Sequence, residues 1–332
     1  MSNTVPKIIS GSSIPRKIKE FTFPTTKELV DLYKVRATTY TLGPDLSDNF
    51  IMEIGAGPGT ITKSILNRAI QYDNCKVSLV ERDKRFVPIH EVMKECYPEN
   101  AYQMVYNDIL KWPDVENEII NHWNTLQPGY FNNANRVQVI GNLPFNIASP
   151  LIISMLRRMS HNEGFLGHPN VDLLLMFQRD VADRFHATPH NRVISRLTIV
   201  SQFVCESKIE LKLKAGAFTP APEVDAALVR FKKREKVLDE RIEFEELEKV
   251  ATYAFNNRRK TLTNNFKNIF KDTEKELKEL NMNPKDRPED YDTDKYCLLT
   301  RYIKDFYPKF MKAHINQLLQ NKFKRPLEEI EI

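Results

Sequence analysis

The segment NFIMEIGAGPGT, residues 49–60, joins an apolar run to a glycine-rich loop and then to a helix-like stretch. Gly55, Gly57 and Gly59 allow the backbone to turn tightly and to approach a ligand without interference from a Cβ atom. The helix that follows would offer free N–H groups to an anionic group. Because the spacing differs from the GxGxxG dinucleotide pattern, the loop taken alone could also be an ordinary turn.

Short apolar runs alternate with helix-like stretches between about residues 50 and 180. The predicted strands are residues 49–55, 76–81, 102–108, 137–142 and 171–177, and the predicted helices are 60–69, 85–95 and 150–159. Such runs are typical of parallel strands buried on both faces, so the pattern predicts an α/β fold, an open Rossmann-like sheet with helices on both sides. Residues 208–214 and 225–233 add an antiparallel pair at the end of this mostly parallel sheet, which then has one antiparallel strand.

The predicted domain organisation has three parts. Residues 1–22 are interpreted as a targeting or flexible N-terminus, 23–235 as the sheet domain, and 236–332 as a small all-helical domain that is charged and poor in strands. The segment at residues 112–136, between two of the strands, is predicted to be an elaborated surface loop.

Composition narrows the classes of protein to consider. The net charge of the 332 residues is only +5. The four cysteines are scattered without a CxxC pair, which argues for a reducing compartment and against a structural zinc site. No apolar run reaches membrane-spanning length. Residues 1–19 contain basic residues and serines but no acid, which is compatible with a mitochondrial presequence although helical apolar spacing is not evident.

Basic residues gather in one part of the predicted helical domain. No acid occurs between Glu248 and Asp272, whereas six basic residues do: Lys249, Arg258, Arg259, Lys260, Lys267 and Lys271. Such a stripe suits contacts with phosphates. A solvated helix face is the alternative, and charge alone favours it.

Acids follow the second and third predicted strands. Glu81 lies about one βαβ step beyond the glycines, where a ribose is expected in nucleotide-binding sheets, and its two oxygens can accept hydrogen bonds from both ribose hydroxyls. Asp108 ends the third strand and can accept from an adenine amino group. Each acid alone could be a solvated strand end, but with the glycine loop they describe a crevice shaped for a nucleoside.

The fourth strand ends in VIGNLPFNIASPLI, residues 139–152. Here the Asn142 amide and the Leu143 carbonyl could each accept a hydrogen from an exocyclic amine, Pro144 fixes the turn, and Phe145 offers a ring on which a base can stack. Methyl transfer to adenine N6 needs such positioning, because the amine lone pair is delocalised into the ring. A helix-capping turn is the alternative interpretation.

Taken in order, EIGAGPGTIT, VERD, NDIL and GNLPFNIASPLI resemble the rRNA adenine-N6 dimethyltransferase family of class I S-adenosyl-methionine-dependent methyltransferases. FTPAPEVDAALVRF, FNNRRKTLTNNF and QRDVADRF are similar to further motifs of that family, and the resemblance covers about residues 23–320. FPTTKELVDLYKVRA and the long segment before the fourth strand are similar to its animal mitochondrial branch.

The resemblance implies roles for individual residues. Gly55 and Gly57 would line the amino-acid end of S-adenosyl-methionine, Glu81 would bind its ribose with Arg82 beside it, and Asp108 and Ile109 would take its adenine. Asn142 would lie between cofactor and target, at a catalytic turn that also contains Leu143 and Pro144. Phe145 and Phe218 would clamp a flipped adenine. Arg258, Arg259 and Lys260 would grip the RNA backbone.

The substrate implied by the resemblance is a pair of adjacent adenosines in the 3′-terminal hairpin loop of small-subunit rRNA, each methylated twice in support of ribosome assembly. Single-stranded loop bases are common targets of specific recognition. The expected partners are the immature small subunit and the mitochondrial transcription machinery, without a membrane, and the expected state is a monomer in the mitochondrial matrix. A cytosolic relative acting on cytosolic rRNA is the alternative location.

Two other functions compete with this hypothesis. The family has an SQNFL-type segment and a helix before the first strand, whereas only about a dozen residues separate Ala37 from that strand here. This departure motivates the hypothesis of a non-catalytic transcription or ribosome-assembly factor, and the retained Glu81, Asp108 and NLPF weigh against it. A DNA adenine methyltransferase would share the NLPF chemistry but would not account for FNNRRKTLTNNF.

Overall fold

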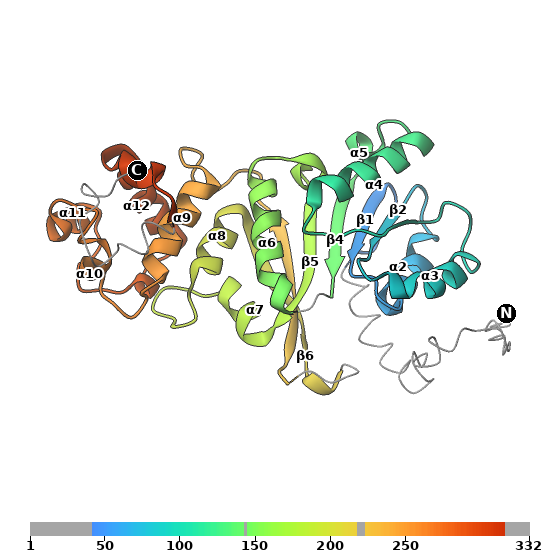
Figure 1. Cartoon of the computed structure of the whole chain (residues 1–332), viewed down its shortest axis with the longest axis horizontal. Coiled ribbons are helices and arrows are strands. Elements are labelled where there is room, and N and C mark those ends of the chain that lie inside the picture. The colour runs from blue at the N-terminus through green and yellow to red at the C-terminus, as the bar shows by residue number, and fades with distance from the viewer. Residues whose placement is uncertain (1–41, 143–144, 218–222, 316–332) are drawn as a thin grey trace.

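A computed structural model describes residues 42–142, 145–217 and 223–315 of the chain. Its strands are β1 (Asn49–Ile54), β2 (Lys76–Val80), β3 (Gln103–Val105), β4 (Arg136–Gly141), β5 (Val171–Gln178), β6 (Cys205–Leu213) and β7 (Ala226–Lys233). They form one seven-stranded sheet in the order β3-β2-β1-β4-β5-β7-β6 (Figure 1). Strands β1 to β5 pair in parallel, and β7 runs antiparallel to both of its neighbours. The predicted fold class is confirmed.

The burial of each strand explains its place in the sheet. Every residue of β1 is buried, as are seven of the eight residues of β5, so both strands at the centre of the sheet consist mostly of apolar residues. In contrast, β6 mixes exposed, intermediate and buried residues because it lies at the edge of the sheet. The predicted antiparallel pair at residues 208–214 and 225–233 corresponds to β6 and β7.

Helices cover both faces of the sheet, as the alternation predicted. The helices that precede the C-terminal part are α2 (Thr60–Ala69), α3 (Val87–Lys94), α4 (Trp112–Leu126), α5 (Tyr130–Asn133), α6 (Phe145–Ser160), α7 (Arg179–Phe185) and α8 (Arg196–Val204). Ile65 and Leu66 of α2 pack with Ile51 on one face, whereas α4, α6 and α8 pack with Met52 and Ile54 on the other. Strand β1 thus contributes alternate side chains to two separate cores.

The prediction of a surface loop at residues 112–136 is wrong. Trp112, Val115, Ile119 and Trp123 are buried along one face of α4, and Trp123 Nε1 donates a hydrogen bond of 2.8 Å to Ser78 Oγ of β2. The spacing of these four residues is helical, but it is interrupted by the Pro, Asn and Glu residues of a segment with a loop-like composition. The segment is therefore part of the sheet's covering layer.

Helix α6 also begins earlier than predicted, at Phe145 rather than Pro150. Pro150 lies inside this helix, where it lacks the N–H that an interior residue would donate. Because the proline lies near the N-terminal end, the helix continues for ten residues beyond it. The start of α6 is therefore only three positions along the chain from Asn142, which follows β4.

The C-terminal part is helical, and it lies at the left of Figure 1, beyond α8. It contains α9 (Phe244–Phe255), α10 (Leu262–Phe266), α11 (Thr273–Glu279), α12 (Thr293–Phe306) and α13 (Pro308–Lys312), and the short 3₁₀ helix η6 (Pro288–Asp290) precedes α12. Three other short 3₁₀ helices lie earlier in the chain: η3 (Lys84–Phe86), η4 (Gly164–Gly167) and η5 (Ala215–Ala217). Phe244 and Leu247 of α9 belong to the same apolar core as Phe203 of α8. The domain boundary near residue 235 falls in the link between β7 and α9, and it stays a prediction.

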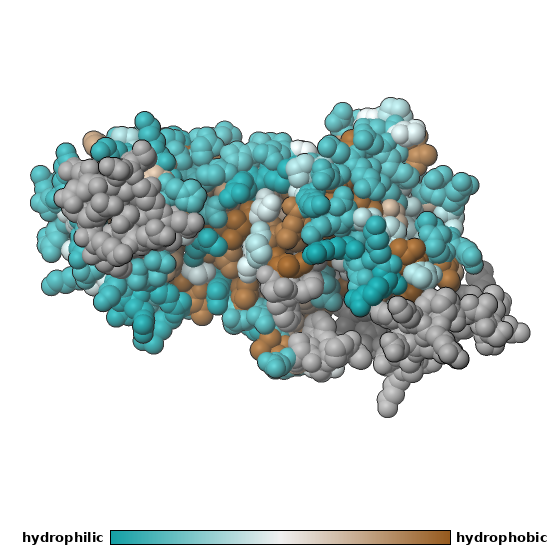
Figure 2. Space-filling view, in the orientation of Figure 1, coloured by the Kyte–Doolittle hydropathy of each residue, from teal (hydrophilic) through white to brown (hydrophobic). Residues whose placement is uncertain are grey.

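The cysteines and the surface agree with the composition of the chain. All four cysteines are free, and Cys205 and Cys297 are buried. On the face shown in Figure 2, hydrophilic side chains predominate and apolar ones gather over the central part. Within the described residues, no helix combines the length and apolar character that a membrane crossing demands.

Candidate active site

Four strand ends meet at one edge of the sheet. The parallel register places Ile54 of β1 opposite Val80 of β2 and Gly141 of β4, and Val80 opposite Val105 of β3. The residues that follow these strands include Gly55, Glu81 and Asn142. Because they leave neighbouring parallel strands at the same level, the glycine loop, the acid and the amide gather at a single edge, as the sequence predicted.

The glycine loop is fixed by hydrogen bonds from β2 and Glu81. Gly55 and Gly57 have φ angles of 75° and 53°, in the left-handed region that favours glycine. The Gly55 N–H donates to the Val80 carbonyl at 2.8 Å, and the Gly57 N–H donates to Glu81 Oε2 at 2.8 Å. The loop therefore turns sharply before α2 and stays attached to the end of β2.

Glu81 retains acceptor capacity beyond these contacts. Its other oxygen, Oε1, accepts from the Asp83 N–H at 2.7 Å, so each carboxylate oxygen has one backbone partner. An ionised carboxylate offers about four acceptor positions, which leaves about two. Two acceptors side by side at a strand end fit the adjacent hydroxyls of a ribose, and the residues present therefore fit a nucleoside cofactor.

Arg82 and Asp108 form an ion pair across the ends of β2 and β3. Arg82 Nη1 lies 3.3 Å from Asp108 Oδ2, and the Arg82 side chain is exposed. Asp108 Oδ1 accepts from the Leu110 N–H at 3.0 Å, and Ile109 beside it is buried. Asp108 and Ile109 thus present one fixed carboxylate and one apolar side chain after β3.

The structure describes only part of the predicted target-base site. Asn142 is exposed directly after β4, and Phe145 is the first residue of α6. Leu143, Pro144 and Phe218 lie outside the described residues, as does the side chain of Phe145.

Arg258, Arg259 and Lys260 are exposed in the turn between α9 and α10, and Arg258 Nε lies 3.9 Å from Glu289 Oε2. The wider basic stripe is only partly on the surface. Lys249 points inward from α9 and donates to the Ala313 carbonyl at 2.9 Å, so this lysine is part of the packing of the helical region. Lys267 and Lys271 are exposed after α10, so the exposed charges lie in the turn after α9 and in the segment after α10 rather than on one continuous helix face.

Glu53 of β1 is a buried acid beneath the glycine loop. It is 2% exposed, and Thr62 Oγ1 donates a hydrogen bond of 2.6 Å to Glu53 Oε2. Burial raises the pKa of Glu53 to about 8, the Thr62 hydrogen bond opposes this shift, and the charge of Glu81 adds to it. The side chain is therefore protonated in the folded protein at neutral pH.

We expect Glu53 to make stability depend on pH. Its folded pKa of about 8 exceeds its ordinary value of 4.5, so the stabilising effect of the bound proton is complete below about pH 4.5 and is lost as the pH rises through about 8. Relative to a Glu53→Gln variant, the free energy of unfolding should fall by up to about 1.4 kcal/mol per pH unit in this window. Denaturant unfolding of both proteins at a series of pH values measures the difference, and parallel curves would contradict it.

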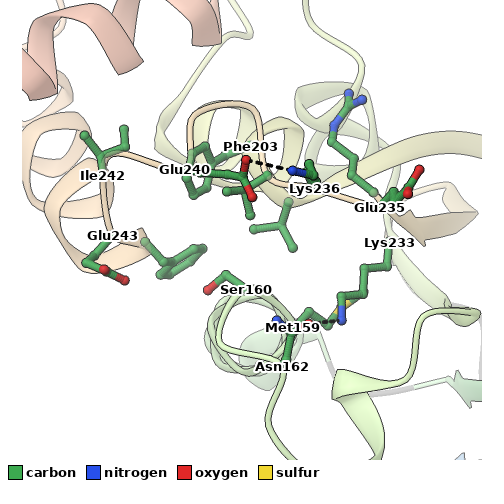
Figure 3. A pocket seen from close by; sticks show the side chains of 14 residues that line it. Met159, Ser160, Asn162, Phe203, Lys233, Glu235, Lys236, Glu240, Ile242 and Glu243 are labelled. Carbon is green, nitrogen blue, oxygen red and sulfur yellow. Dashed lines mark hydrogen bonds and ion pairs between the residues drawn. The ribbon is translucent and has the colours of Figure 1, made fainter.

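A cavity of about 220 Å³ lies elsewhere (Figure 3), between the C-terminal ends of α6 and α8 and the link from β7 to α9. Phe203, Met159 and Ile242 line it together with Lys233, whose Nζ donates to Asn162 Oδ1 at 2.7 Å. Lys232 pairs with Asp172 near the start of β5, so this cavity lies at the opposite edge of the sheet from Asn142. None of the predicted site residues that the structure describes lines it.

Two further residues contact the glycine loop or its neighbours without any signal in the sequence. His90 of α3 donates to the Gly57 carbonyl, and Tyr106 follows β3 and contacts the same histidine. A single histidine on an amphipathic helix gives no signal of this kind in the sequence, because the contact depends on how α3 packs against the loop.

Comparison with known proteins places this site in a family. The model described as "Ribosomal RNA adenine dimethylase" matches residues 27–305. "Dimethyladenosine transferase 1, mitochondrial" of Vermamoeba vermiformis is 30% identical over 297 residues, which cover 77% of this chain and 82% of that protein. The protein of the same name from Caenorhabditis elegans is 32% identical over 270 residues, 74% of this chain and 70% of that one.

Solved structures agree on the fold. The crystal structure of a dimethyladenosine transferase from Plasmodium falciparum superposes with a TM-score of 0.59 at 20% identity, covering 82% of this chain and 96% of that one. The crystal structure of 23S rRNA methyltransferase ErmE superposes with a TM-score of 0.54 at 18% identity, covering 82% of this chain and 97% of that one. The names of the sequence relatives confirm the predicted mitochondrial location. The chain therefore belongs to the ribosomal RNA adenine dimethylase family, as an rRNA adenine dimethyltransferase that uses S-adenosyl-methionine.

Proposed function

We propose that this enzyme dimethylates N6 of two adjacent adenosines in the 3′-terminal hairpin loop of mitochondrial small-subunit rRNA, and thereby supports ribosome assembly. The observation that carries the proposal is the strand register, which sets Asn142 at the level of Gly55 and Glu81. A methyl donor on the glycine loop and an amine held by Asn142 would then be neighbours.

Each residue has a defined task in this proposal. Gly55 and Gly57 lie against the amino-acid end of the cofactor and Glu81 binds its ribose hydroxyls, while Asp108 and Ile109 receive its adenine. S-adenosyl-methionine supplies an electrophilic methyl group on its sulfonium. A helix N-terminus and a carboxylate at one edge provide partners for both ends of such a molecule.

The target base is held by the turn after β4. Asn142 Oδ1 and the Leu143 carbonyl accept the two hydrogens of the adenine N6 amine, which orients its lone pair towards the donor. Phe145 and Phe218 stack on the extracted base, because N6 is inaccessible in a stacked and paired adenine. A loop adenosine is already unpaired, so its extraction costs less than that of a base in a duplex.

Incubation of the purified chain with labelled cofactor and the isolated rRNA hairpin tests the proposal. We expect label on the two loop adenosines, and none on a hairpin in which both are replaced by guanosine. A hairpin without label, under conditions in which a full-length relative methylates it, would refute the proposed substrate.

The competing hypothesis of a non-catalytic transcription or ribosome-assembly factor rests on the short segment between Ala37 and the first strand, and the family membership of the chain disfavours it. Calorimetric titration with S-adenosyl-methionine separates the two functions, because a purely binding protein has no need of the donor. Tight binding favours the enzyme.

A further inference from the structure

We propose that His90 is a positioning residue that holds the Gly57 peptide in the conformation required for cofactor binding, with Tyr106 fixing the His90 ring in turn. This inference rests on the proposed cofactor site and adds to it a residue outside the glycine loop and the strand-end acids. Three separate elements meet in the arrangement: the loop after β1, helix α3 and the end of β3.

The contacts form a continuous chain of hydrogen bonds that runs through the backbone of Gly57. The Gly57 N–H donates to Glu81 Oε2 at 2.8 Å, and the Gly57 carbonyl lies 2.8 Å from His90 Nε2. His90 Nδ1 lies 2.8 Å from Tyr106 Oη. Both polar backbone groups of Gly57 are therefore held by side chains, one from the end of β2 and one from α3.

The chemistry of the partners assigns the tautomer of His90. A carbonyl oxygen can only accept, so Nε2 donates to Gly57 and Nδ1 of the neutral ring accepts from the Tyr106 hydroxyl. His90 is fully buried, and burial lowers its pKa. The neutral ring is thus the form that suits both contacts.

Gly57 needs such support because glycine restricts its own backbone little. Its φ of 53° is one of several conformations that glycine adopts readily, and the nearest neighbour of an added Cβ atom would be 3.9 Å away. Packing against the α-carbon therefore does not select the conformation. The hydrogen bonds do so, and a loop fixed before the ligand arrives avoids part of the ordering cost of binding.

The expected effect is on affinity for the cofactor and not on the methyl-transfer step. His90 contacts Gly57 and, after β3, Tyr106, whereas Asn142 follows β4 on the other side of β1, so loss of His90 should weaken binding of the ground state and of the transition state alike. For His90→Leu we expect the Kd and KM for S-adenosyl-methionine to rise about tenfold, the usual effect of one lost buried hydrogen bond, with kcat within about twofold.

Conservative variants separate positioning from packing. The amide nitrogen of glutamine can replace Nε2 as donor, so His90→Gln should recover most of the affinity. Tyr106→Phe should raise Kd about twofold to threefold, and it should have no further effect in the His90→Leu background because Tyr106 acts through His90. A nitrogen NMR spectrum of the full chain should show His90 as the neutral ring protonated at Nε2.

Two controls make the result decisive. His122→Leu removes a histidine that is only partly buried and packs edge-to-face on Trp123 of α4, and it should leave Kd unchanged. Glu81→Ala should abolish cofactor binding if the proposed site is right. If Glu81→Ala abolishes binding while His90→Leu and His122→Leu both bind like the parent chain, His90 has no positioning role. If Glu81→Ala binds normally, the proposed site itself is wrong and the inference falls with it.

Discussion

Replacement of Asn142 by alanine is expected to lower kcat for rRNA methylation by about 10²–10³-fold while the Kd for S-adenosyl-methionine stays within about threefold. This is the usual cost of deleting one preorganised polar group at a reacting centre. The adenine N6 amine is a weak nucleophile, so its rate depends on how it is oriented towards the donor. Asn142 is exposed after β4, and its side chain is not needed for the packing of the sheet.

Single-turnover assays with saturating cofactor and hairpin measure the chemical step directly. Asn121→Ala is a matched control, because Asn121 is an exposed asparagine on α4 and alanine suits a helix. A kcat for Asn142→Ala within tenfold of the parent would remove the amide from the mechanism. Loss of cofactor binding together with activity would instead indicate that Asn142 supports the glycine loop.

The fold could be predicted because its signals are local and periodic. Central strands such as β1 and β5 are buried on both faces, so apolar residues dominate each of them, although β1 contains Glu53 and β5 contains Asp172. The register of parallel strands then brings Gly55, Glu81 and Asn142 to one edge whatever the loops do. The order of the motifs indicates the reaction, methylation of adenine, which the periodicity of apolar residues alone does not indicate.

Features that depend on tertiary packing could not be predicted in this way. The polar composition of helix α4 predicts a loop, although Trp112 and Trp123 are buried on one of its faces. Lys249 belongs to the basic stripe in the sequence, but its amine donates a hydrogen bond to the carbonyl of Ala313, a residue 64 positions away in the chain. The link from His90 to Gly57 is likewise a contact between distant segments, and no spacing rule indicates it.

The combined substitution of Arg258, Arg259 and Lys260 by alanine is expected to weaken binding of the rRNA hairpin by roughly tenfold to a hundredfold at low salt. All three side chains are exposed in the turn between α9 and α10. Binding of a polyanion releases counterions in proportion to the phosphates neutralised, so the slope of log K against log salt should fall by about two to three. Fluorescence anisotropy with a labelled hairpin across a salt series measures both quantities.

A charge-matched variant shows whether the effect is local. Lys278, Lys309 and Lys312 are exposed on α11 and α13 of the same helical region, and their replacement by alanine changes the net charge by the same amount. If the turn after α9 contacts the RNA backbone, the control variant should keep most of the affinity and salt slope. Equal losses in both variants would mean that the helical region attracts RNA only through its overall charge. Because S-adenosyl-methionine binds at the edge of the sheet in this scheme, its Kd should be unaffected in either variant, and kcat at saturating RNA should be preserved.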